Sequence, residues 1–355
     1  MDQLTSHLTR RAALSAAVLA PLALSACGNR TLTQSDGGTT TVRFMLNWYP
    51  YGEHAPFYYG VEQGIFEEHG IDLRIEPGQG AAKTTQAVGA GEVNFGWADT
   101  PVVLGNIDNG VDVRSIGVFL QTTPSAVQFF ADSGIESADD LGGLTIATSA
   151  GDAPTTTFPL FLEAAGLAAG DVTEQNIDPA GKNSALITGQ VDALIGFAHD
   201  QSPIIAETSG KEMASISYAD VGLNFFSNGL ITSGEQIAAD RGIVQAMLDA
   251  TSAAFAAARE DPEGAVASMR GKDPQIAEPH VLLEQWTRTV DLLTTENSTS
   301  DVPGANTEED WANTISMSSS QRSFAAFMSS PRISAWSMMF WRTLRHSSSA
   351  GRWKT

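Results

Sequence analysis

Two stretches of the chain, "GAGEVNFGWADTPVV" (89–103) and "ITGQVDALIGFAHDQSPII" (187–205), follow one plan. Each has the end of a helix, a glycine, a short apolar strand, a second glycine, and then an aromatic residue followed by alanine and aspartate. The aromatic-to-acid step is "WAD" at 97–99 in the first stretch and "FAHD" at 197–200 in the second. Because such a unit occurs twice, far apart in the chain, we predict two lobes built alike.

The residues around the first stretch alternate between strand-like and helix-like patterns. Strands are expected at 42–46, 71–75 and 93–97, and helices at 55–68 and 81–90. Gly64 and Gly70 mark helix ends, where a residue without Cβ takes the left-handed conformation. Alternation of this kind predicts parallel sheets flanked by helices, so the expected fold class is α/β.

Composition limits the possible functions. The 355 residues exceed one typical domain, and 42% hydrophobic with 17% charged residues is ordinary for a globular protein. A formal net charge of −21 repels phosphate backbones, so we expect no nucleic-acid partner. The six histidines show no metal-ligand spacing, and we expect neither a metal nor a cofactor.

The N-terminus indicates export. Arg10 and Arg11 precede an apolar stretch, 12–26, that is too short to span a bilayer. It ends in "LSAC" (24–27), which resembles the bacterial lipobox, and the "TRR" at 9–11 resembles a twin-arginine signal. We therefore expect a signal peptide over 1–26, a lipid anchor on Cys27, a tether over 27–40, and an extracytoplasmic, membrane-anchored protein exported by the Sec or twin-arginine route. Cys27 is the only cysteine, so no internal disulfide is possible.

A family resemblance covers about residues 41–317. The ordered motifs are "LNWYP", "HAPFYYGVEQGIFEEHGIDL", "GAGEVNFGWADTP", "SADDLGGLTIATSAGDAP", "TGQVDALIGF" and "NFFSNGLITSGE". Together they resemble the extracytoplasmic solute-binding proteins of the nitrate, sulfonate, taurine and thiamine-precursor family of ABC importers. The resemblance implies capture of a small molecule by lobe closure and its delivery to a membrane permease and its ATPase, by a protein expected to be a monomer.

The same resemblance implies a two-lobed periplasmic-binding-protein-like (type II) fold with a hinge of two crossing segments. The crossings are expected near 126–131 and near 223–227. Lobe I would comprise 41–128, lobe II 129–224, and the return to lobe I with the closing helices 225–317.

The first loop, "NWYPYGEHAPFYYG" (47–60), indicates the ligand class. Its "NWYP" with His54 beyond the proline resembles the thiamine-pyrimidine branch of the family. Aromatic faces stack on a flat heterocycle, and a carboxylate takes paired hydrogen bonds from a ring nitrogen and an exocyclic amine. Asp200 matches the position of the ligand-binding carboxylate in that branch, although a surface turn or a cap before Pro203 would also explain it.

A sulfonate or nitrate ligand is the alternative. Such an anion needs Arg, Lys or a free helix N-terminus. The loop 148–159 opens a predicted helix and offers Thr155 as a donor, but Asp152 would occupy the helix dipole. Asp152 also fits a plain N-cap before Pro154. We therefore expect an uncharged or cationic aromatic heterocycle.

Residues that follow strands are the remaining candidates, because ligands of open α/β sheets lie beyond the carboxyl ends of strands. Trp97 has a second interpretation as a packing residue between the lobes, and His54 as a helix cap. The expected ligand-binding residues are Asn47, Trp48, Tyr51, Glu53, His54, Trp97, Asp99, Gln121, Ser149, Asp152, Thr155, His199, Asp200 and Asn228.

Catalysis is not expected. A pyrimidine synthase of the same branch resembles this chain at "NWYP" and the following histidine, but it needs a Schiff-base lysine, and no lysine lies in the first loop. The cysteine-rich motif typical of those synthases is also absent. A sensor or scaffold lipoprotein that binds a partner protein is the alternative from another class.

The segment 318–355 departs from the pattern. It contains six Lys and Arg residues and no Asp or Glu. An upstream change of reading frame explains the abrupt shift in composition, and a basic-aromatic segment at the membrane surface is the alternative.

Overall fold

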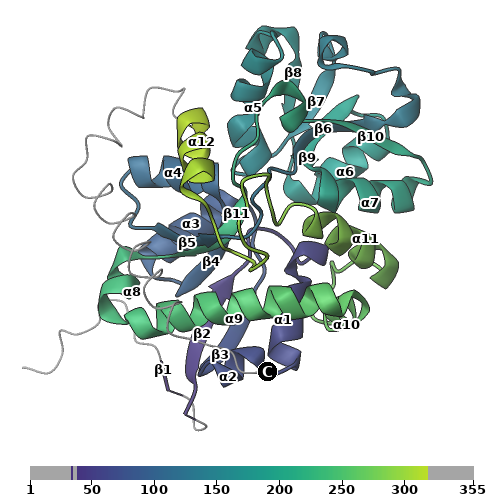
Figure 1. Cartoon of the computed structure of the whole chain (residues 1–355). Helices are drawn as coiled ribbons and strands as arrows, with labels where there is room; N and C mark the ends of the chain where they lie inside the picture. Colours follow the sequence, from purple (N-terminus) through teal and green to yellow (C-terminus); the bar gives the residue numbers. More distant parts are fainter. Residues whose placement is uncertain (1–32, 35–37, 319–355) are drawn as a thin grey trace, which may run out of the picture. The chain divides into compact units, whose positions relative to one another are not determined.

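The computed structural model describes residues 33–34 and 38–318. The expected signal peptide, Cys27 and residues 319–355 lie outside the described residues, so those predictions stay predictions. Two β-sheets with flanking helices form the described part (Figure 1). Within it, no helix combines the length and the apolar character needed to cross a membrane.

The first sheet has the order β1-β2-β4-β11-β5, and β3 pairs with β2. Strands β2, β3 and β4 are parallel, whereas β11 is antiparallel to both β4 and β5. Its strands are β1 (Thr33–Gln34), β2 (Thr40–Met45), β3 (Ile71–Glu76), β4 (Phe95–Asp99), β5 (Arg114–Val118) and β11 (Asn228–Thr232). The elements connected to this sheet are the short η1 (Gly52–His54), α1 (Ala55–Glu62), α2 (Ile65–Glu68), α3 (Ala81–Ala90), α4 (Thr100–Asp108), α8 (Gly234–Ala239), α9 (Arg241–Glu260), α10 (Pro262–Ala267), α11 (Pro279–Val290) and α12 (Glu308–Ser318).

The second sheet has the order β10-β6-β9-β7-β8. Strands β7, β8 and β9 pair in parallel, and β6 is antiparallel to β9 and β10. Its strands are β6 (Ser125–Phe130), β7 (Thr145–Thr148), β8 (Thr173–Asn176), β9 (Ala193–Phe197) and β10 (Met213–Ser217). The helices are α5 (Ala153–Ala164), α6 (Pro179–Ile187) and α7 (Ala198–Ser209), with short 3₁₀ turns at Ala131–Ser133, Ala138–Leu141, Ala169–Asp171 and Ala219–Val221.

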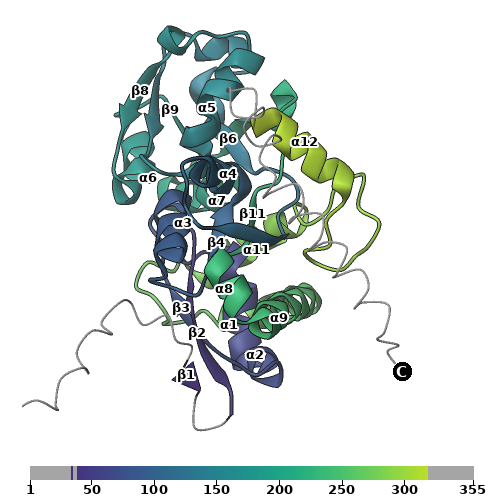
Figure 2. The same ribbon diagram turned by 90° about the vertical axis from the view of Figure 1, so that its left-hand side faces the viewer.

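Each sheet has its own hydrophobic core. Phe57, Trp97 and Phe255 are fully buried in the first, where their rings contact one another. Phe161 and Tyr218 pack together in the second. Helix α9 lies beside α1 and α2 in both views and closes the first core (Figures 1 and 2). These cores confirm the α/β fold class.

The chain passes between the two sheets twice. Residues 119–124 join β5 to β6, and residues 218–227 join β10 to β11. The expected second crossing, 223–227, lies within the second connection. The expected first crossing, 126–131, was wrong, because 126–130 lie inside β6, which is paired on both edges with β9 and β10.

The two copies of the repeated unit have the same local structure, and the strand expected at 93–97 is observed as β4, Phe95–Asp99. In each copy a strand runs directly into a helix, β4 into α4 and β9 into α7. The expected helix over 55–68 divides at Gly64, whose φ is 75°, so α1 ends at Glu62 and α2 begins at Ile65. Gly70 also has a positive φ, 74°, at the end of α2.

Candidate functional site

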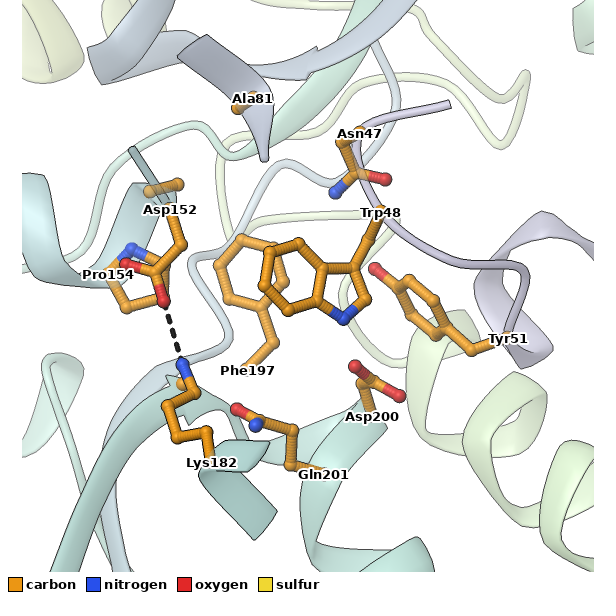
Figure 3. A pocket seen from close by; sticks show the side chains of 12 residues that line it. Asn47, Trp48, Tyr51, Ala81, Asp152, Pro154, Lys182, Phe197, Asp200 and Gln201 are labelled. Atoms are coloured by element: carbon orange, nitrogen blue, oxygen red, sulfur yellow. Dashed lines mark hydrogen bonds and ion pairs between the residues drawn. The ribbon is translucent and has the colours of Figure 1, made fainter. Parts of the chain in front are cut away.

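A cavity of about 30 Å³ lies between the loop after β2, the carboxyl end of β9 and the start of α5 (Figure 3). A volume of this size holds about two water molecules. Its walls come from elements of both sheets, beyond the carboxyl ends of strands, as expected for an α/β protein. The lining residues are Asn47, Trp48, Tyr51, Ala81, Asp152, Ala153, Pro154, Lys182, Gly196, Phe197, Asp200 and Gln201.

Trp48 fills the middle of this lining. Its indole lies in front of the Phe197 ring in Figure 3, with Tyr51 and Asp200 at one side and Lys182 at the other. The Lys182 Nζ lies 5.8 Å from the centroid of the indole ring. Two aromatic side chains, Trp48 and Phe197, therefore line the cavity, and aromatic faces of this kind can hold a flat ring by stacking.

Backbone hydrogen bonds fix the loop that carries Trp48. The Gly78 N–H donates to Trp48 O (3.0 Å) and the Gly80 N–H donates to Asn47 O (2.8 Å). A Cβ at position 78 would lie 1.9 Å from Leu46 O, so only glycine permits this approach. At position 80, where φ is +114°, a Cβ would lie 2.9 Å from Gly151 O, on the loop before α5.

Lys182 is tied down within the cavity wall. Its Nζ donates to Asp152 Oδ2 (2.7 Å) and to Ile195 O (2.8 Å), and its side chain is 1% exposed. Asp152 also accepts the Thr155 N–H (2.9 Å) at the start of α5. The N-cap interpretation of Asp152 is thus confirmed. The ammonium of Lys182 and the N-terminus of α5 therefore both have an acceptor in Asp152.

Asp200 presents a buried carboxyl to the cavity. Burial and the charge of Glu53 raise its pKa to about 8, against the lowering effect of Lys182. At neutral pH this group is therefore a neutral acid that can donate as well as accept a hydrogen bond.

Behind the cavity, Glu53 is the centre of a buried hydrogen-bond network. Its Oε1 accepts from Trp97 Nε1 (2.5 Å) and Asn228 Nδ2 (2.7 Å), and its Oε2 accepts from Tyr51 OH (2.5 Å) and His199 Nε2 (2.7 Å). Burial alone would raise the pKa of this carboxyl, but the hydrogen bonds and the charge of His199 lower it to about 2. Glu53 is thus an ionised acceptor with four donors.

His54 is fully buried beside this network. Its Nε2–H donates to Asn47 Oδ1 (2.8 Å), and its Nδ1 accepts the Tyr51 N–H (3.3 Å). Burial lowers the pKa of its imidazole to about 4, so the ring is neutral. It shapes the first loop from behind and does not line the cavity.

The fourteen expected binding residues therefore fall into three groups. Asn47, Trp48, Tyr51, Asp152 and Asp200 line the cavity. Glu53, His54, His199 and Asn228 stand directly behind it. Trp97, Asp99, Gln121, Ser149 and Thr155 do not line it.

The third group makes other contacts, although the Trp97 indole N–H also belongs to the hydrogen-bond network of Glu53. Trp97 is 0% exposed, and its ring packs in the first core, so no indole face is left for stacking and a direct stacking role is wrong. Asp99 accepts from Ser227 Oγ (2.8 Å), and Gln121 donates to Leu293 O (2.8 Å). Ser149 Oγ donates to Ile177 O (2.8 Å), and its N–H donates to Thr155 Oγ1 (3.2 Å).

Several residues of the site were missed from sequence. Phe197 carried a signal, because it is the aromatic residue of the second repeated unit. Lys182 and Gln201 lie on helices, where nothing in the local pattern distinguishes them from surface residues. Gln285, on α11, reaches the site from a segment with no motif at all.

The fold defines a class of protein, the periplasmic-binding-protein fold, here with a cavity lined by residues from both α/β sheets. The chain belongs to the NMT1/THI5-like family, whose model matches residues 52–265, more than half of the chain. It is 25% identical over 232 residues to a formylaminopyrimidine-binding protein of Halalkalibacterium halodurans, covering 64% of this chain and 69% of that protein.

A second relative is a 4-amino-5-hydroxymethyl-2-methylpyrimidine phosphate synthase of Aspergillus parasiticus, 28% identical over 172 residues. The alignment covers 48% of this chain and 49% of the synthase, so the chain spans about half the length of that relative. Among solved structures, the periplasmic aliphatic sulphonate-binding protein of Escherichia coli superposes with a TM-score of 0.61 at 16% identity, covering 78% of this chain and 85% of that one. This likeness shows the fold.

Proposed function

We propose that this chain is an extracytoplasmic solute-binding protein that captures a small aromatic heterocycle of the thiamine-pyrimidine type and delivers it to an ABC permease. One observation carries the proposal: the cavity combines the faces of Trp48 and Phe197 with the buried carboxyl of Asp200. A planar ring with nitrogen at its edge satisfies both features at once.

The size of the cavity implies opening and closing. A volume of about 30 Å³ excludes a pyrimidine ring, and the walls come from both sheets. Entry of a ligand therefore requires the two sheets to separate, with residues 119–124 and 218–227 as the hinge. In this proposal lobe I is formed by residues from 41 to the first connection and again from 228, and lobe II by the residues between the connections.

A free anion fits the site less well. Lys182 is the only cation among the residues that line the cavity, and it is paired with Asp152. A sulfonate would have to compete with this carboxylate for the ammonium. We therefore assign the alkanesulfonate class as the alternative ligand.

Binding rather than synthesis is supported by the state of two side chains. Both ring nitrogens of His54 are hydrogen-bonded, and the residue is fully buried. Lys182 is held by two acceptors. Neither is presented as a free nucleophile, which favours the relatives named as binding proteins over those named as synthases. The lipid anchor on Cys27 and a monomeric state complete the proposal.

Calorimetry and thermal-shift measurements test the ligand class. We expect 4-amino-5-hydroxymethyl-2-methylpyrimidine to bind and raise Tm, and ethanesulfonate and nitrate to have no effect. Asp200→Ala should weaken pyrimidine binding by about tenfold or more, since a buried hydrogen-bonded pair is lost. Thr208→Ala, on the exposed face of the same helix, is the control. Stabilisation by nitrate or the sulfonate alone would overturn the proposed ligand.

A further inference from the structure

Gln285 connects two walls of the site through one side-chain amide. Its Nε2 donates to Asp200 Oδ1 (3.0 Å) and to Asp200 O (2.9 Å), and its Oε1 accepts the Gly52 N–H (2.8 Å). The residue is 0% exposed. These contacts use both N–H groups and a lone pair of the amide, so its orientation is fixed.

The two partners of Gln285 belong to different parts of the fold. Helix α11 packs in the first core through Leu282 and Trp286. Gly52 lies directly against this helix, since a Cβ there would approach Leu282 O to 2.4 Å. Asp200 lies in the first turn of α7, which packs against the second sheet. The hydrogen bonds to Asp200 therefore form only when α7 lies against α11.

The contact also distinguishes the two oxygens of Asp200. Oδ1 accepts the Gln285 N–H, and among the described residues no hydrogen bond reaches Oδ2. In a neutral carboxyl group the carbonyl oxygen is the better acceptor, so an N–H donated to Oδ1 favours the acid proton on Oδ2. We propose that Gln285 is a specificity-determining positioning residue: it keeps Oδ2 toward the ligand and makes Oδ2–H a donor in the closed site. This inference rests on the proposed function.

The proton on Asp200 has a structural cause. The carboxyl is buried and faces the ionised Glu53 of η1, and the cation of Lys182 on α6 only partly offsets these effects. A neutral acid held in this way donates to an unprotonated ring nitrogen, as in a 4-aminopyrimidine. The 4-oxo analogue has a ring N–H at that position, so two donors would meet. Gln285 thus selects the amino form of the ring over the oxo form.

Matched variants separate this role from a structural one. The measurement is the ratio of Kd values at pH 6.5 for 4-amino-5-hydroxymethyl-2-methylpyrimidine and its 4-oxo analogue. The wild-type protein should prefer the amino compound by about tenfold or more. Gln285→Met frees the Asp200 carboxyl to turn, and should reduce the preference to about threefold or less. Thr287→Ala, on the exposed face of α11, should leave the ratio unchanged.

A conservative variant provides the rescue. In Asp200→Asn the amide oxygen accepts from Gln285 and the amide N–H replaces Oδ2–H, so the preference for the amino compound should persist. Gln285→Glu keeps an acceptor for the Gly52 N–H but loses the N–H donor to Asp200, so it should also lose the preference for the amino compound. This variant takes the place of Gln285→Met if Gln285→Met does not fold.

The outcomes distinguish the two proposals. If the wild-type protein binds the amino compound and both Gln285 variants keep the wild-type ratio, the inference about Gln285 is overturned while the proposed function stands. If neither pyrimidine binds the wild-type protein, the proposed function fails and the inference fails with it. A lost preference in the Gln285 variants, with Thr287→Ala unchanged, supports the positioning role.

Discussion

The two repeated units, β4–α4 and β9–α7, share a sequence plan but face different surroundings. In the first, Trp97 and Asp99 turn into the interior beside the crossing chain, with 0% and 1% exposure. In the second, Phe197 and Asp200 line the cavity. A strand that runs directly into a helix therefore supplies either core residues or the wall of a cavity.

The difference follows from where each helix begins. In "WAD" the acid is the N-cap of α4, which starts three residues after Trp97. In "FAHD" helix α7 starts directly after Phe197, so Asp200 lies in the first turn of the helix. Asp99 consequently lies beside Asn228, its partner across the antiparallel pair of β4 and β11. Asp200 projects from the helix toward the cavity. The inserted histidine itself reaches Glu53.

Replacing the aromatic residue of each unit with alanine should give the largest difference between the two units. Trp97→Ala removes a fully buried ring and one donor to Glu53, and should lower the free energy of unfolding by about 3–5 kcal/mol. Phe197→Ala should cost only about 2 kcal/mol, because one face borders the cavity, but should abolish binding of the heterocycle. Urea unfolding followed by circular dichroism measures both, and equal losses would contradict the assignment.

Glu53 joins the two units, since Trp97 donates to one oxygen and His199 to the other. In Glu53→Gln, an amide N–H₂ would face N–H and O–H donors. The variant also removes the buried negative charge that these donors stabilise. We expect a loss of about 3 kcal/mol in unfolding free energy. Glu62→Gln, on the exposed face of α1, should change it by less than about 0.5 kcal/mol. A loss as small as that of the control would show that the network does not form.

The acidic residues of the two units, Asp99 and Asp200, should affect the stability of the protein over different pH ranges. Burial raises the pKa of Asp99 to about 7 and that of Asp200 to about 8, from 3.8. The folded state thus holds protons that the unfolded chain has released. The resulting stability is complete below about pH 4 and is lost as the pH rises through these folded-state values, by at most about 1.4 kcal/mol per pH unit for each group.

Two other buried groups of the site, Glu53 and His54, titrate in the folded protein below pH 6.5. His54 and Glu53 have folded-state pKa values of about 4 and 2, lower than those of the unfolded chain, so their contributions change below the window between pH 6.5 and 9. We expect Tm to fall across it in the wild-type protein. Asp200→Asn should flatten the curve above pH 7.5, whereas Asp99→Asn should leave a slope up to about pH 8. Identical curves for the two variants would contradict the difference between the units.

Local patterns were sufficient for much of the fold. Strand 71–75 and helix 81–90 alternate with the period of their elements, and glycines mark their ends, so local rules placed them within a residue. The first connection between the sheets was misplaced because residues 126–130 are mostly apolar. This composition fits a buried segment that crosses between sheets as well as a buried strand. Only its neighbours β9 and β10, distant in sequence, make it a strand.

The sequence predicted those residues of the site that follow a strand, either in the first loop or in the second repeated unit. Asn47, Trp48, Tyr51 and Asp200 were found in this way. Trp97 satisfied the same rule but points into the core, because side-chain direction depends on what packs on that face. Lys182 and Gln285 belong to the site through contacts with residues 30 and 85 positions away, which no local pattern encodes.

The close approach of Gly80 to Gly151 has a consequence for how a molecule would enter and leave the cavity. These loops meet backbone to backbone, with the Ala82 N–H donating to Gly151 O (3.3 Å). A side chain at position 80 would force these two loops apart without replacing any side chain that lines the cavity. In the proposed function, the rate of ligand release and the choice of ligand would then depend on different residues.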